Sequence, residues 1–214
     1  MHRALGIFLL MLSTAAVGYG QYYVLQHLPF IDCLPYKRGN DIQEQMKTPA
    51  GAVPDSVSIQ MSFKKNGKNV QFDINQFPAE FDSTYVYLDR KEVLIQKGNG
   101  LVAKIIDFSL FTMNNLDTTQ ALFNTKNPYV LIFAGNIDAS VPWETLISTI
   151  QEKHQQVYLI TADKSNALQL NLNIPVLVGD MTMIKTAARV WPTVVIMNGS
   201  RIMEKQSYID FLKK

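Results

Sequence analysis

The chain opens with an apolar run that a soluble domain of this size would not bury. A short basic start, His2 and Arg3, is followed by residues 4–25, which carry no formal charge. About 20 apolar residues are enough to cross the hydrocarbon core of a bilayer as a helix. Residues 1–28 are therefore predicted to be a transmembrane anchor or a signal peptide.

Two interpretations of this run stay open. Gly18 and Gly20 offer a small-residue cleavage pattern before Gln21, which would release a secreted, freely soluble protein. We favour an uncleaved anchor, because Tyr22–Leu25 extends the apolar stretch and supplies aromatic residues suited to a membrane interface. The few basic residues flanking the run do not decide its orientation.

Composition excludes two classes of function. With 20 basic and 18 acidic residues the net charge is only +2, and the lysines are scattered, so no nucleic-acid partner is expected. The single cysteine, Cys33, rules out an intramolecular disulfide and any dithiol chemistry within one copy of the chain. No cofactor is predicted.

A juxtamembrane linker over residues 29–54 is predicted next. The stretch Pro29–Asn40 contains two prolines and a glycine, so the first helix should stop near Leu28. Residues Thr48–Pro54 are typical of an extended connection, and Asp41–Lys47 between them has the length of one or two helical turns.

Residues 55–98 predict a small β-hairpin module. Apolar and polar residues alternate over Val57–Phe63, and Asn66-Gly67 follows as a strong two-residue turn signal. A turn there pairs apolar residues throughout, namely Phe63 with Val70, Met61 with Phe72 and Ile59 with Ile74. Two further runs, 84–88 and 92–96, suggest a second pair of strands closed around residues 89–91.

Residues 101–214 predict an α/β domain. The apolar runs at 128–134, 157–161 and 193–197 are separated by amphipathic helical patterns at 143–153 and 180–190. Fully apolar strands spaced by helices indicate a sheet covered on both faces. A second Asn-Gly hairpin at 198–199 and a closing helix around Tyr208–Leu212 complete the pattern.

This last region resembles the thioredoxin fold. The resemblance rests on a βαβ unit, a helix, and then the run Trp191-Pro192-Thr193-Val194-Val195-Ile196-Met197-Asn198-Gly199. It implies that Pro192 opens a strand in the cis form, beside the turn that carries the redox cysteines of catalytic relatives. Here the corresponding loop, Asn136–Trp143, has no cysteine, and Ser140 before Pro142 is predicted to be a helix N-cap. Serine cannot replace a thiolate in disulfide exchange, so we expect a redox-inactive domain.

A wider resemblance covers nearly the whole chain. The residues His27-Leu28-Pro29, Ile31-Asp32, Pro35-Tyr36-Lys37, Gly39 and Ile42, then Phe63–Gly67 and Ile106-Asp107-Phe108, are similar to the carboxyl-terminal half of Bacteroidetes-type DoxX-family membrane proteins. The family implies a bacterial inner-membrane location with a periplasmic soluble part. In that family a multi-helix bundle precedes this region, so a separately encoded bundle is the expected partner.

The expected partner-binding surface lies at the end of the sheet. Its residues are Trp191, Pro192, Asn136, Asp138 and Trp143. The resemblance implies that Trp191 faces a groove, because the residue before this proline lines the substrate groove in thioredoxin-like folds. The alternative function is an accessory role in periplasmic thiol or quinone redox, with Cys33 forming an intermolecular disulfide.

The remaining titratable residues favour no catalytic role. The turns or strand ends around Asp107, Asp138 and Asp163 indicate solvated carboxylates rather than general acids. His27, at the end of the first helix, is expected to make an interfacial hydrogen bond or to cap a carbonyl, and no metal site is predicted.

Overall fold

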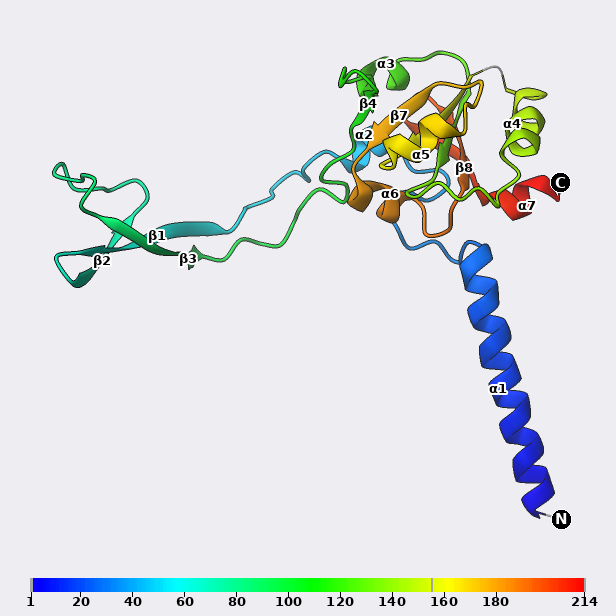
Figure 1. Cartoon of the computed structure of the whole chain (residues 1–214), viewed down its shortest axis with the longest axis horizontal. Coiled ribbons are helices and arrows are strands. Elements are labelled where there is room, and N and C mark those ends of the chain that lie inside the picture. The colour runs from blue at the N-terminus through cyan, green and yellow to red at the C-terminus, as the bar shows by residue number, and fades with distance from the viewer. Residues whose placement is uncertain (1, 155, 214) are drawn as a thin grey trace. The chain divides into compact units, whose positions relative to one another are not determined.

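The computed structural model describes residues 2–154 and 156–213 of the chain. They form two compact units, which are taken separately below. One unit comprises residues 1–47 and 104–214, and the other comprises residues 48–103. Figure 1 shows the course of the chain.

Helix α1 (His2–Gln26) is the predicted apolar helix. Its segment Leu5–Gln26 is long and apolar enough to cross a membrane, with a mean hydropathy of 1.3 and none of that window buried. A signal sequence near an N-terminus also meets these criteria of length and hydropathy, so this helix is compatible with either an anchor or a signal peptide. The helix ends two residues before Leu28, just ahead of Pro29.

The predicted linker 29–54 divides at Lys47, and its first part is not a linker. Residues up to Lys47 belong to the α/β unit, where Tyr36 and Ile42 lie in the hydrophobic core. This part runs beside strand β9 (Arg201–Ser207). The Gly39 N–H donates to the carbonyl of Ile202 in that strand, and the Ile42 N–H donates to the carbonyl of Ser200, in the turn just before it. Helix α2 (Ile42–Gln45) follows, with the Asp41 carboxylate accepting the Glu44 N–H at its N-cap. The segment covers a sheet edge that would otherwise expose unpaired backbone groups.

The unit of residues 48–103 is a three-stranded antiparallel sheet in the order β2-β1-β3. Its strands are β1 (Ser56–Lys65), β2 (Lys68–Asp73) and β3 (Val86–Gln96). Residues Asn66 and Gly67 both have positive φ, as the turn requires. The predicted register is confirmed: Phe63 pairs with Val70 and Met61 with Phe72, and Ile74 N–H donates to the Ile59 carbonyl.

The second predicted hairpin, 84–88 with 92–96, is wrong. Residues 86–96 form one continuous strand, β3, which pairs along β1 from Ser56 to Lys64. The segment Asp89–Lys91 lacks the glycine, asparagine or proline that a tight turn favours. Because β1 is ten residues long and its second edge is free, these charged residues continue the ladder instead.

Aromatic rings cover one end of this small sheet. Phe63 is the only buried residue of its three strands, and its ring lies 5.0 Å from that of Phe81 and 5.9 Å from that of Tyr87, centroid to centroid. The other members of this aromatic cluster are Phe72, Phe77 and Tyr85. Lys65 Nζ lies 3.9 Å from the centre of the Tyr85 ring, a cation–π contact.

The other unit is built on a six-stranded mixed sheet in the order β4-β7-β6-β5-β8-β9. The strands before β9 are β4 (Leu110–Thr112), β5 (Tyr129–Phe133), β6 (Val157–Thr161), β7 (Val176–Gly179) and β8 (Thr193–Asn198). Strand β6 is parallel to β5 and to β7, whereas β4, β8 and β9 join their neighbours in antiparallel fashion. The three predicted central strands are confirmed, and β4 and β7 are additions that the pattern did not predict.

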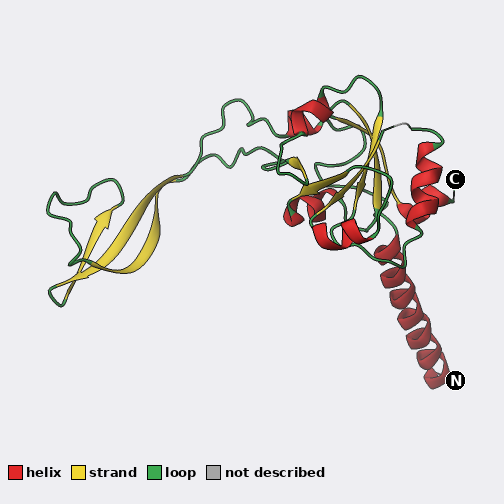
Figure 2. Cartoon of the chain, turned by 45° about the horizontal axis from the view of Figure 1, so that its top comes forward, coloured by secondary structure: helices red, strands yellow, loops and turns green. Residues whose placement is uncertain are grey.

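Helices cover both faces of this sheet, as Figure 2 shows. They are α3 (Thr119–Phe123), α4 (Trp143–Gln151), α5 (Lys164–Gln169), α6 (Met181–Ala187) and α7 (Tyr208–Leu212). Alternate residues of β5 enter two separate cores: Leu131 packs with residues of α3 and α6, and Ile132 packs with residues of α4 and α5. The sequence-based prediction of an α/β unit with a doubly covered sheet is confirmed.

Candidate functional site

The candidate site is the end of the sheet where β5 stops and β8 begins. Phe133, the last residue of β5, pairs with Thr193, the first of β8. The loop after β5 and the Trp191–Pro192 segment before β8 are therefore neighbours, and the Trp191–Pro192 peptide bond is cis, as predicted. Gly135 lies between them: a Cβ atom there would overlap the Trp191 ring and lie 3.0 Å from Met181 Sδ.

Trp191 is held in place from three sides. Its ring lies against Gly135 and Met181, and its indole Nε1–H donates to the Ala188 carbonyl at 3.0 Å. The side chain is half-buried at the margin of one core, whereas Pro192 is buried. Part of the Trp191 residue thus remains accessible beside the loop, whereas the buried Pro192 lies below the accessible surface.

The loop 136–142 presents the exposed polar part of the site. Asn136 and Asp138 are both exposed. The Asp138 carboxylate accepts the Ser140 N–H at 2.8 Å, and this hydrogen bond holds the pKa of Asp138 below its usual range. Asp138 is therefore an ionised residue that shapes its own turn.

Trp143 lies in the core, so its prediction as a surface residue is wrong. It is only 4% exposed and packs with the α4 residues Leu146 and Ile150 against one face of the sheet. Trp143 begins the apolar stripe of an amphipathic helix, which explains its burial. Its Nε1–H donates to the Asp138 carbonyl at 2.9 Å, so Trp143 positions the loop from below.

The predicted N-cap at Ser140 is also wrong. Helix α4 begins at Trp143 with Pro142 at its N-cap position, and no side chain caps it. Ser140 lies two residues too early, in the turn that Asp138 closes. The described hydrogen bond of Ser140 is therefore local, made by its backbone N–H to Asp138 within the same turn.

Asp163 supports the loop from the neighbouring strand. Its carboxylate caps α5 by accepting the Asn166 N–H and also lies 3.5 Å from the Ile137 N–H. Hydrogen bonds from Asn166 lower the pKa of Asp163. Since Asp138 and Asp163 are each stabilised in the ionised form, neither is suited to donate a proton as a general acid at neutral pH.

Cys33 lies on a different segment from this loop. It is exposed in the stretch between α1 and α2, and it is the chain's single cysteine. The sheet end offers a hydroxyl, an amide and carboxylates, which bind by hydrogen bonding and charge. No thiol is available there for disulfide exchange.

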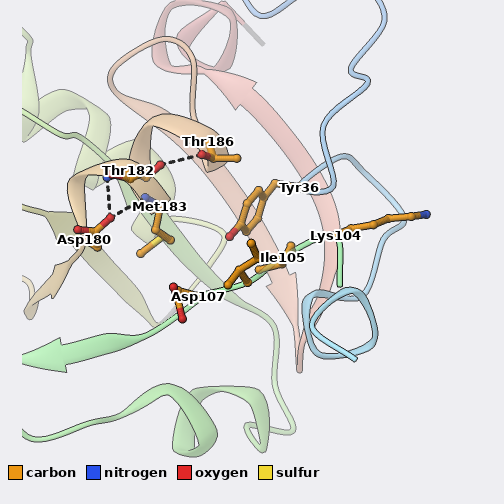
Figure 3. Close-up of a pocket in the computed structure, with 9 residues that line it drawn as sticks. Tyr36, Lys104, Ile105, Asp107, Asp180, Thr182, Met183 and Thr186 are labelled. Atoms are coloured by element: carbon orange, nitrogen blue, oxygen red, sulfur yellow. Dashed lines mark hydrogen bonds between the residues drawn. The ribbon is translucent and has the colours of Figure 1, made fainter. Parts of the chain in front are cut away.

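A second concave feature lies in the α/β unit, between the segment that precedes α2, residues 104–107 and helix α6 (Figure 3). Its volume is about 280 Å³. The residues that line it are Tyr36, Lys104, Ile105, Ile106, Asp107, Asp180, Thr182, Met183 and Thr186. We call it the Tyr36 pocket. Sequence reasoning missed it, because its residues come from three separated stretches of the chain.

Two polar pairs join the segment just after α1 to the C-terminal part of the chain. His27 Nδ1 lies 2.7 Å from Asp210 Oδ1, so His27 meets a carboxylate rather than the carbonyl considered from the sequence. Lys205 Nζ lies 2.7 Å from Asp32 Oδ2, and the Lys205 side chain is only 4% exposed. Burial lowers the pKa of Lys205, although the hydrogen bond to Asp32 opposes that shift.

Comparison with known proteins yields one finding. A family described as a domain of unknown function (DUF8463) matches residues 58–97, which span nearly all of the three-stranded sheet. No match was found among curated proteins or among solved structures. The match covers less than half of the chain and lies outside the α/β unit.

Proposed function

We propose that this chain is a membrane-anchored, redox-inactive thioredoxin-like protein that binds a membrane-protein partner through the end of its six-stranded sheet. We call the exposed part of that end, Asn136, Asp138 and the accessible side of Trp191, the loop surface. The partner that we propose is a DoxX-type helical bundle. The soluble part would face the periplasm from the bacterial inner membrane.

The strand order carries this proposal. A parallel β5-α4-β6 unit followed by the antiparallel strands β8 and β9 and a closing helix is the arrangement expected of a thioredoxin-like domain. The loop after β5 lies beside Pro192, where a catalytic relative would place its thiols, and this loop contains none. A retained scaffold without its reactive groups favours recognition over catalysis.

The DoxX resemblance gains support from contacts within the α/β unit. The Tyr36 ring of the juxtamembrane motif lies 6.0 Å from the ring of Phe108, which belongs to the Ile106-Asp107-Phe108 motif, centroid to centroid. Asp32 of the first motif makes the buried pair with Lys205. These two motifs therefore belong to the α/β unit, which supports the proposed junction between a membrane helix and a soluble domain.

Site-specific photocrosslinking tests the partner. A benzophenone amino acid replaces Asn136 or Asp138 in the full chain, co-expressed with a DoxX-type bundle in membranes. We expect an adduct with the bundle from both positions. The matched control is Gln151, an exposed residue at the far end of α4. Equal labelling from Gln151, or no adduct from the loop, contradicts the proposal.

A separate measurement tests the redox part. Reduction of insulin by dithiothreitol should proceed at the buffer rate in the presence of the full chain. Acceleration that survives Cys33→Ser would show a catalytic activity that the proposal excludes. Mass spectrometry of the mature amino terminus decides between an anchor and cleavage near Gly20.

The exposure of Cys33 favours a second candidate function. An accessible thiol close to the end of α1 could form a transient disulfide with another chain in an accessory role for thiol or quinone redox. After alkylation of free thiols, a mixed-disulfide adduct would appear on a non-reducing gel and disappear in Cys33→Ser. Loss of function together with the adduct would favour this role over binding alone.

A further inference from the structure

The Tyr36 pocket is lined by a phenol hydroxyl that is accessible from the pocket. The Tyr36 residue as a whole is only 3% exposed, and its hydroxyl is the polar end of that side chain at the pocket wall. Figure 3 shows the hydroxyl directed into the space between Met183, Ile105 and Asp107. Burial and the nearby Asp107 raise the pKa of Tyr36, so the phenol stays neutral and can accept as well as donate.

The charged groups around this hydroxyl are unbalanced. Asp107 and Asp180 both line the pocket, and in the described part of the chain neither carboxylate forms a salt bridge. Asp180 Oδ1 already accepts the Thr182 and Met183 N–H groups, which lower the pKa of Asp180 and keep it ionised. The Lys104 side chain extends away from the pocket (Figure 3).

The remaining wall is apolar. Ile105 and Met183 are both nearly fully buried and face the same space. A volume of about 280 Å³ is at the small end for ligand pockets, which suits a single short side chain or a small molecule. An apolar wall, two exposed carboxylates outside any described salt bridge and a phenol oxygen that faces the pocket together favour a cationic head on an aliphatic stem.

We propose that the Tyr36 pocket binds an alkylammonium or alkylguanidinium group. The cation would donate hydrogen bonds to the carboxylates of Asp107 and Asp180 and to the Tyr36 hydroxyl oxygen, with its stem against Ile105 and Met183. The group can belong to a free amine or to a lysine or arginine side chain of another protein. This site is separate from the loop surface and does not depend on the partner proposed for it.

Methyl NMR on the full chain in detergent micelles tests this site. Methionine methyl groups are labelled with ¹³C, and Met183→Leu assigns the Met183 signal. Butylammonium and butylguanidinium chloride should shift this signal saturably, more weakly at high salt because the attraction is ionic. Butanol and butanoate, with the same stem but no positive charge, should leave it unmoved.

Variants identify the groups responsible. Asp107→Asn should weaken butylammonium binding about tenfold, the effect of losing a charged hydrogen-bond partner. Tyr36→Phe should weaken it about fivefold, and the Asp180→Asn variant, which keeps a good helix cap, should also weaken it. Glu152→Gln, an exposed carboxylate on another helix end, is the matched control and should change nothing.

The outcomes distinguish a free amine from a side chain of another protein as the source of the cation, and they also define what would contradict the proposal. Binding of Nα-acetyl-lysine methylamide as well as butylammonium would favour a protein side chain, and binding of butylammonium alone would favour a free amine. An unchanged Met183 signal, an equal shift with butanoate, or binding indifferent to Asp107→Asn and Tyr36→Phe would overturn the proposal.

Discussion

The two sheets of this protein are stabilised in different ways. All five residues of β5 in the six-stranded sheet are buried, and each face of that sheet has its own hydrophobic core. In the three-stranded sheet only Phe63 is buried, and large residues such as Val86 and Ile95 are exposed. A strand that is apolar throughout needs cover on both sides, whereas an alternating strand can leave one face in water.

The difference teaches where stability is concentrated. The α/β unit depends on many buried aliphatic contacts, so damage to either core should affect the whole unit. The small sheet depends on one tight turn and one aromatic cluster. Substitutions matched between the two sheets can therefore sharpen or break the comparison.

The largest contrast is expected from the same substitution placed in each sheet. Ile132→Ala in β5 removes a side chain with no exposed surface and should cost about 2–5 kcal/mol in free energy of unfolding. Ile95→Ala in β3, where the side chain is 67% exposed, should change it by less than about 0.5 kcal/mol. Urea denaturation of the full chain in detergent measures both. Similar losses in free energy of unfolding from the two variants would show that another part of the protein packs on the exposed face of the small sheet.

A local loss is expected at the centre of the aromatic cluster. Phe63→Ala removes the ring that contacts Phe72, Phe77, Phe81, Tyr85 and Tyr87, and should cost the small sheet about 3 kcal/mol. Hydrogen exchange read by mass spectrometry should then rise in peptides of residues 56–96 and stay unchanged in those of β5 and β6. Faster exchange in both regions would mean that the two units unfold together.

The two sheets also differ in how far their strands could be predicted from the sequence. The β1–β2 register was predictable because two local signals, alternation and Asn66-Gly67, agree, and the central strands were predictable from their apolar runs. Strand β3 was misjudged because its charged middle, Asp89–Lys91, indicates a turn until the long free edge of β1 is known. Strands β4 and β7 are only three and four residues long, too short for a periodic pattern.

The candidate sites depend more heavily on long-range contacts. The neighbourhood of Trp191 and the loop after β5 was predictable from a known strand order. Trp143 was misjudged, because its position at the start of the apolar stripe of α4 already indicates burial against the sheet. The Tyr36 pocket joins residues about 70 and 145 positions apart along the sequence, and no local pattern links them. The buried Lys205 was equally hidden, because its partner Asp32 lies in a segment that the prolines made resemble a linker.

The Lys205–Asp32 pair offers a test confined to the α/β unit. Asp32→Asn leaves the buried Lys205 ammonium without its counter-charge and should cost about 3 kcal/mol, while Lys205→Met should cost less because it removes the charge altogether. Loss of Asp32 also lowers the pKa of Lys205 further. The unfolded chain then binds more protons at alkaline pH, so the stability of the Asp32→Asn variant should rise as pH approaches the unfolded-state value of about 10.4. Urea denaturation from pH 7 to 10 checks the slope, and a flat profile would place Lys205 in contact with water.

The smallest effect is expected at the first Asn-Gly turn, where the small sheet depends on backbone conformation. Gly67 has a φ of 79°, and an ideal Cβ there meets nothing within 4 Å, so Gly67→Ala is strained only through its backbone. We expect a loss of about 1 kcal/mol, seen as faster hydrogen exchange in β1 and β2 alone. Gly6→Ala, in α1 and equally free of contacts but without a positive φ, is the control and should leave exchange in the small sheet unchanged. Because only one turn joins β1 to β2, a Gly67→Ala variant that exchanges at the wild-type rate would show that the aromatic cluster alone sets the stability of this sheet.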